Sequence, residues 1–141
     1  MRFLITENRI NDYGFVIMSK HLHLIWRIKT PHLLKNVQRD FLKYTAQQIK
    51  FDLQANDPDL LSRFKVNAAD RDYQFWERNA LSVDLFSEHV FMQKFEYIHN
   101  NPTQEKWKLV LYPEDYRWSS ANYYYRGVDN FGFISHIRGD E

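Results

Sequence analysis

The stretch "YGFVIMSKHLHLIWRI", residues 13–28, contains two short apolar runs that are separated only by Ser19 and Lys20. Two runs of this length with a two-residue gap between them predict a β-hairpin. Ser-Lys lacks the Asn-Gly or Gly-rich chemistry that two-residue hairpin turns prefer, so we expect the turn to be held by its surroundings. The fold must therefore be built around this antiparallel pair of strands.

The second strand of the hairpin is predicted to have two different faces, because alternate side chains of a strand point to opposite sides of the sheet. One face carries both imidazoles and comprises His21, His23, Ile25 and Arg27. The other face is expected to pack on the core and comprises Leu22, Leu24, Trp26 and Ile28. The two imidazoles, side by side on one face, are the first candidate functional feature of the chain.

The next segment, residues 30–53, has the apolar spacing of a helix. Thr30 is a plausible N-cap, and Pro31 then takes the first helical position, where proline is favoured. Three cations recur every four residues and form one row along this helix: Lys35, Arg39 and Lys43. The row fits a surface that binds phosphates, and it also fits an ordinary solvated helix face.

A second helix is predicted over residues 87–101, with Ser87 as its N-cap. Its core stripe has the spacing i, i+4 and i+7 and comprises Phe91, Phe95 and Ile98. Pro102 ends the helix, because the residue before a proline is pushed away from helical geometry. Together the elements predict an α+β fold, an antiparallel sheet with helices packed on one face.

Length and composition limit the classes of protein that remain. The 141 residues suit one domain, 1–141, with a single core, and the aromatic share of 17% predicts a folded chain. The absence of cysteine excludes disulfides, thiolate metal sites and a catalytic thiol, and it suits a reducing cytoplasm. The start has too short an apolar run for a secretory signal, and no stretch approaches a membrane span. We therefore expect a cytoplasmic protein without a membrane partner.

The net charge of +1 is unevenly distributed along the chain. Residues 1–50 hold nine Lys and Arg against three Asp and Glu, a net of +6, and the remainder has a net of −5. This split permits an anionic partner such as nucleic acid for the first part. A balanced surface with local clusters would explain it as well.

Two histidines at i and i+2 on a strand can reach one divalent cation, although the same pattern also fits two structural histidines. Such a site needs a third ligand. Tyr97 and Asn101 are four residues apart on the second helix and share a face, so Asn101 could supply an amide oxygen. The hydroxyl of Tyr97 would then lie one helical turn away, as a nucleophile for a phosphodiester. An ordinary position on an amphipathic helix is the other interpretation of Tyr97.

Three stretches, in this order, resemble the single-tyrosine HUH transposases, specifically their insertion-sequence-200-like and REP-associated branches. "VIMSKHLHLIW" (16–26) is similar to their strand in which two histidines flank an apolar residue. "FEYIHNNPT" (95–103) is similar to their Tyr-Ile-His-x-Asn-Pro helix, and "YRWSSANYY" (116–124) to the Ser-Ser-Ala segment that follows. The three stretches span most of the chain.

The resemblance implies a ferredoxin-like HUH nuclease fold and a transposase that cuts and rejoins single-stranded, hairpin-forming DNA through a 5′-phosphotyrosine. It implies that His21, His23 and Asn101 bind Mg²⁺ or Mn²⁺ and that Tyr97 is the nucleophile. It further implies a homodimer, associated with the nucleoid. The cations expected to contact DNA are Lys20, Arg27, Lys29, Lys35, Arg39 and Lys43.

Two features depart from the family pattern. The family usually has Pro-Asn before the first histidine, where this chain has Ser19 and Lys20. The family also carries a strand and a helix ahead of the hairpin, so we expect an N-terminally shortened copy here. Loss of the inner strand would leave an unpaired edge, to be filled by a partner chain or by a rearranged sheet.

Three other functions remain open. A DNA-binding remnant would keep its affinity for single strands without cutting them. A metal-dependent hydrolase is also possible. A nucleotidyl hydrolase of the histidine-triad type would require a third alternating histidine, and position 25 is Ile25.

Overall fold

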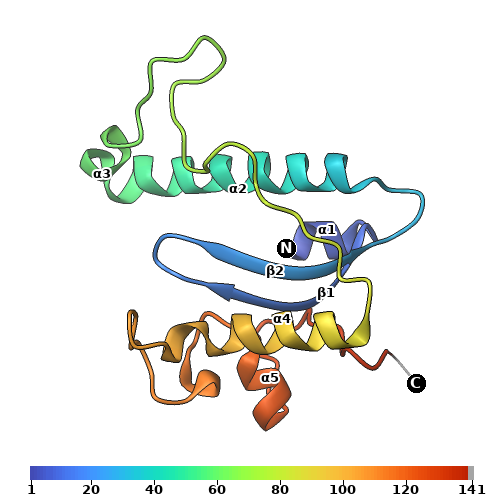
Figure 1. The fold of residues 1–141 in the computed structure, drawn as a ribbon. Coiled ribbons are helices and arrows are strands. Elements are labelled where there is room, and N and C mark those ends of the chain that lie inside the picture. Colours follow the sequence, from blue (N-terminus) through green and yellow to red (C-terminus); the bar gives the residue numbers. More distant parts are fainter. Residues whose placement is uncertain (140–141) are drawn as a thin grey trace. The chain divides into compact units, whose positions relative to one another are not determined.

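The computed structural model describes residues 1–139, which divide into two compact units. The first unit comprises Met1–His32 and the chain from Asp84 onward, and the second comprises Leu33–Val83. The fold is α+β, with one two-stranded antiparallel sheet and several helices, which confirms the predicted class (Figure 1). Within residues 1–139, no helix combines the length and the apolar character needed to cross a membrane.

The predicted hairpin is confirmed. β1 (Ile10–Ile17) pairs antiparallel with β2 (Leu22–Ile28). The N–H of Met18 donates to the carbonyl oxygen of His21 at 2.8 Å, so the two residues between them form the turn. His21 therefore lies at the end of the turn, immediately before β2, the strand that carries the second imidazole.

β1 contains one irregularity, a β-bulge at Tyr13, where the register shifts between Asp12 and Gly14. Asp12 is fully buried, and neither of its carboxylate oxygens has a hydrogen-bond partner of ordinary geometry among the described residues. Burial raises the pKa of Asp12 to about 7; the Met1 ammonium and the N–H of Gly14 act in the opposite direction but do not offset it. The strand thus holds a carboxyl group that is costly to ionise.

The outer edge of β1 is closed by segments from the last quarter of the chain. Three backbone hydrogen bonds make this connection: Ile17 N to Trp118 O at 2.8 Å, Ser120 N to Phe15 O at 3.0 Å, and Ser135 N to Asp12 O at 2.7 Å. β2 has β1 as its only neighbour in the sheet. One edge of the hairpin is therefore satisfied from within the first unit, and no third strand joins the sheet within residues 1–139.

α4 (Glu88–Asn100) lies alongside the hairpin (Figure 1). Its N-cap is confirmed as Ser87, whose hydroxyl accepts from the N–H of Val90 at 3.2 Å. The buried core of the first unit joins both strands to this helix and comprises Val16, Met18, Ile25, Phe95 and Ile98. The helix ends just before Asn101, where a 3₁₀ turn that includes Pro102 takes over.

The expectation for the two faces of β2 is wrong in one respect. Ile25, on the same face as the imidazoles, is only 6% exposed and belongs to this core. The residues expected to make the core face are half-buried: Leu22, Leu24, Trp26 and Ile28. The physical reason is that α4 packs its apolar stripe against the histidine face, so that face is a core surface as well as a candidate site.

The first unit contains four further short elements. They are α1 (Arg2–Thr6), η1 (Asn101–Thr103), η2 (Pro113–Asp115) and α5 (Ala121–Arg126). α5 ends at Gly127, whose φ of 72° is the left-handed conformation that glycine adopts readily after a helix.

The second unit is built on α2 (Leu34–Asn56), followed by α3 (Pro58–Ser62). The prediction that Thr30 caps this helix and Pro31 begins it is wrong. The N–H of His32 donates to the carbonyl of Lys29 at 2.9 Å, so Thr30 and Pro31 occupy the centre of a turn, and the helix starts at Leu34, three residues after Pro31. A local turn therefore takes precedence over the capping pattern.

Candidate functional site

Four of the residues singled out in the sequence lie together where the hairpin meets the end of α4. The ring centroids of His21 and His23 are 5.1 Å apart. The ring of Tyr97, in the last turn of α4, lies 5.7 Å from that of His23 in an edge-to-face arrangement. Asn101 follows the helix, and its Oδ1 is 3.4 Å from Nε2 of His21. Two imidazoles, a phenol and an amide that are widely separated in sequence thus form one cluster.

One distance between polar atoms of the cluster is compatible with two ligands of a shared divalent cation. Ligand atoms about 2.1 Å from one ion lie roughly 3.0 Å apart at a right angle and roughly 3.4 Å apart at the tetrahedral angle. The 3.4 Å between His21 Nε2 and Asn101 Oδ1 falls in this range. Asn101 is 1% exposed, so its amide is held in place. Among residues 1–139 no group of three or more His, Cys, Asp or Glu could hold a metal ion. A cation bound by His21 and His23 would therefore need a third ligand of another type, such as the amide oxygen of Asn101.

The electrostatic environment of His23 favours its neutral form. Burial lowers its pKa, and the nearby charges of His21 and Lys94 lower it further. A neutral imidazole keeps a lone pair on one ring nitrogen, which is the form that binds a cation.

Lys94 is a residue of this site that the sequence reasoning missed. It lies three residues before Tyr97 on α4, so the two side chains share a face, and it is exposed. The spacing was available in the sequence, but only the fold places this lysine near His23. A cation here would face a phosphate that approaches Tyr97.

We expect Lys94→Gln to raise the pKa of His23 in the metal-free protein, because it removes a positive charge that opposes protonation of the ring. The measurement is the chemical shift of the His23 ring protons as a function of pH. Lys108→Gln, at another exposed lysine, is the control and should leave the titration unchanged. An unchanged His23 pKa in Lys94→Gln would contradict the assignment of Lys94 to this site.

Trp107 is a second residue that the sequence reasoning missed. Its ring lies 5.4 Å from that of His21, and the Nζ of Lys106 lies 5.4 Å from the centroid of the Trp107 ring. The indole Nε1 is buried without a hydrogen-bond partner among the described residues. No local pattern predicted this contact, because Trp107 reaches His21 only through the turns after α4. The indole ring packs beside the imidazole of His21 and limits its movement.

His99 occupies the inner side of α4, between Tyr97 and Asn101. It is 1% exposed, and its Nε2 lies 2.7 Å from Oγ of Ser120. Burial lowers the pKa of His99 to about 4, so the ring is neutral at neutral pH. It takes no part in the cluster of four, and it faces the interior of the first unit.

Three of the cations expected to contact DNA belong to the first unit. Lys20, in the hairpin turn, and Arg27, on β2, are exposed. Lys29 is half-buried, and its Nζ donates to Oδ1 of Asn8 at 2.6 Å. Lys20 and Arg27 are therefore the more accessible cations on the hairpin.

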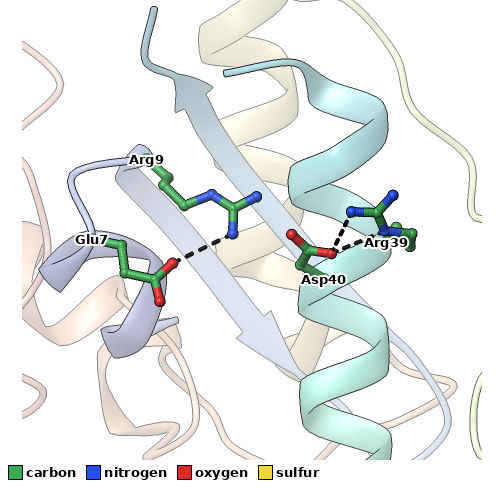
Figure 2. Close-up of polar contacts among 4 residues, drawn as sticks. All are labelled: Glu7, Arg9, Arg39 and Asp40. Carbon is green, nitrogen blue, oxygen red and sulfur yellow. Dashed lines mark hydrogen bonds and ion pairs between the residues drawn. The ribbon is translucent and has the colours of Figure 1, made fainter. Parts of the chain in front are cut away.

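The other three cations, Lys35, Arg39 and Lys43, lie on α2 in the second unit, and all are exposed. Arg39 pairs with its neighbour Asp40 at 2.9 Å. Figure 2 shows this pair, as well as the pair of Arg9 with Glu7 at 3.4 Å in the first unit. The six cations are thus divided between the two units, whereas the four residues of the cluster belong to one.

Comparisons of the chain with protein-family models, with curated proteins and with solved structures find no match.

Proposed function

We propose that the chain is a single-tyrosine HUH transposase, which cuts and rejoins single-stranded DNA. The observation that supports this most strongly is the convergence of His21, His23, Tyr97 and Asn101 from two distant segments. These are the residues for which the resemblance to the family implies a role. A ferredoxin-like HUH architecture is part of the proposal, with the β1–β2 hairpin and α4 as its histidine strand and its tyrosine helix.

In the proposed reaction the phenolic oxygen of Tyr97 attacks the phosphorus of a phosphodiester. The new bond joins this oxygen to phosphorus, and the bond from phosphorus to the 3′ oxygen breaks. The phenol loses a proton and the 3′ oxygen gains one, so the products are a 5′-phosphotyrosine and a free 3′-hydroxyl. Because a phenol, with a pKa near 10, leaves more readily than a sugar hydroxyl, a 3′-hydroxyl can reverse the step without an external energy source.

His21, His23 and Asn101 would hold the divalent cation of the enzyme, Mg²⁺ or Mn²⁺. When bound, the ion supplies Lewis-acid polarisation of the phosphate and offsets charge on its non-bridging oxygens. The amide oxygen suits either ion, whereas two imidazoles favour Mn²⁺. The lowered pKa of His23 keeps this ligand in its binding form.

Access to the cluster fits a polymeric substrate. Tyr97 is 45% exposed, so an extended strand can reach its hydroxyl from solvent. Lys20, Arg27 and Lys94 are exposed cations of the same unit that would contact the phosphate backbone. We also propose that the chain forms a homodimer and associates with the nucleoid through DNA.

The test is covalent capture. The protein is incubated with end-labelled, hairpin-forming single-stranded DNA and Mn²⁺, and the products are separated on a denaturing gel. We expect a protease-sensitive band of protein joined to DNA that forms with Mn²⁺ and not with excess chelator. Mass spectrometry of the digested band should place the nucleotide on the peptide that contains Tyr97.

A second candidate, a DNA-binding remnant without cleavage, is favoured by one observation. In the part of the chain that the structure describes, β2 has only β1 beside it in the sheet, whereas the family has a further strand there. Binding of the hairpin DNA with no covalent band under any divalent cation would support the remnant and contradict the enzyme.

A further inference from the structure

The end of α4 is tied to the hairpin through one hydroxyl group, that of Ser120. Oγ of Ser120 lies 2.7 Å from Nε2 of His99, on α4. The same oxygen accepts from the N–H of Phe15, on β1, at 2.9 Å and lies 3.2 Å from the carbonyl oxygen of Phe15. All three residues are at most 3% exposed. A buried side chain of the helix is thus connected to the backbone of the strand without water.

The hydrogen bonds among His99, Ser120 and Phe15, together called the link, can all be formed at the same time. A hydroxyl has one hydrogen and two lone pairs. The N–H of Phe15 and the Nε2–H of His99 can each donate to Oγ of Ser120, and the hydroxyl hydrogen can then donate to the carbonyl of Phe15. All three contacts are satisfied in this arrangement, which assigns the Nε2–H tautomer to His99. Removal of the imidazole would leave one lone pair of the buried Ser120 hydroxyl without a hydrogen-bond donor.

The backbone of β1 approaches the helix very closely at this point. A Cβ added at Gly14 would lie 3.3 Å from Oγ of Ser120, 3.3 Å from Cε2 of Phe95 and 3.4 Å from Cδ1 of Ile98. Strand and helix are therefore closely packed at Gly14, and a Cβ at this position would require its neighbours to move by a few tenths of an ångström.

The link lies beside the candidate site. His99 is two residues from Tyr97 and two from Asn101, and Phe15 pairs with Leu24, the neighbour of His23. The link therefore joins the two elements whose separation sets the distances within the cluster.

We propose that His99 and Ser120 are positioning residues. Their hydrogen bond holds the end of α4 against the hairpin in the position in which Tyr97 and Asn101 face the two imidazoles. The expected effect on the reaction rate rests on the proposed function. The expected effect on cation binding rests only on the geometry of the hydrogen bond.

The experiment compares His99→Leu, which removes the ring nitrogens, with His99→Gln, whose side-chain amide can donate from a position close to that of Nε2. Two quantities are measured on the full chain: the affinity for Mn²⁺ by electron paramagnetic resonance, and the rate of adduct formation at saturating hairpin DNA. Because a shift of about 1 Å in a reacting group costs on the order of 100-fold in rate, we expect His99→Leu to slow adduct formation by roughly 10- to 100-fold. We also expect it to weaken Mn²⁺ binding about tenfold, as loss of an orienting contact does at metal sites. His99→Gln should recover most of both.

Ile10→Val is the control for general destabilisation, because Ile10 is 1% exposed, as His99 is, and lies five residues before Phe15 on β1. If His99→Leu changes the Mn²⁺ affinity and the adduct rate no more than Ile10→Val does, the positioning role is wrong, while the proposed function stands. If the wild type binds Mn²⁺ but forms no adduct, the proposed function is wrong, and the Mn²⁺ affinities alone decide the positioning role. If the wild type binds no Mn²⁺ and forms no adduct, both are overturned.

Discussion

Tyr97→Phe is expected to abolish the covalent DNA adduct while leaving the protein folded and able to bind DNA. The substitution removes only the phenolic oxygen, which in the proposed reaction forms the bond to phosphorus. Among the described residues, Tyr97 is the phenol that lies beside His23, at a ring distance of 5.7 Å, so we expect no other hydroxyl group to replace it. We expect the adduct to fall below detection, a loss of at least about a thousandfold in rate.

The fold should tolerate this change. Tyr97 is 45% exposed, and substitutions at exposed positions usually alter the free energy of unfolding by less than about 0.5 kcal/mol. Tyr125→Phe is the matched control, since Tyr125 is 55% exposed on α5 and lies outside the cluster. The measurements are the gel assay for the adduct and fluorescence anisotropy for DNA binding. An adduct that persists in Tyr97→Phe would remove this residue from the role of nucleophile.

Asp12→Asn is expected to change the free energy of unfolding more favourably at pH 8 than at pH 4. Burial raises the pKa of Asp12 from 3.8 to about 7. Between these two values the folded state holds a proton that the unfolded state has lost, so this group reduces stability progressively as the pH rises from 4 to 7. Above the folded-state pKa the reduction is complete and amounts to about 4 kcal/mol. Asparagine has no such charge to bury.

The measurement is the free energy of unfolding in urea for both proteins at pH 4, 6 and 8. The free energy of unfolding of Asp12→Asn minus that of the wild type should increase by about 4 kcal/mol from pH 4 to pH 8. Comparison with the wild type at each pH cancels the contributions of other groups, such as His99. Asp84→Asn, at an exposed position, makes the same change in net charge and is the control. A constant difference from pH 4 to pH 8 would contradict a buried, unpaired carboxyl group at position 12.

The features that could be predicted from the sequence are those encoded in neighbouring residues. The hairpin follows from two apolar runs with a two-residue gap, and the N-cap at Ser87 follows from a residue type and a helical pattern. Tyr97 and Asn101 could be assigned to one face of a helix because they are four residues apart. The meeting of this face with His21 and His23 was a prediction from resemblance, and the structure does bring the four residues together.

The features that could not be predicted depend on contacts between distant segments. Ile25 is buried because α4 covers the histidine face, which nothing in the alternation of β2 reveals. Trp107 reaches His21 through turns with no periodic signal. The hydroxyl of Ser120 meets Phe15 across 105 residues of sequence. In each case tertiary packing decides the environment, and local propensity carries no information about it.

The closure of β1 by later segments has a consequence for synthesis on the ribosome. A hairpin of two strands is marginal on its own in water, and the edge of β1 stays open until Trp118 and Ser135 have been translated. Contacts that span so much of the chain also form slowly once they can form. A nascent chain would therefore carry its two histidines through most of translation before the edge of β1 is complete, so the proposed site would assemble late.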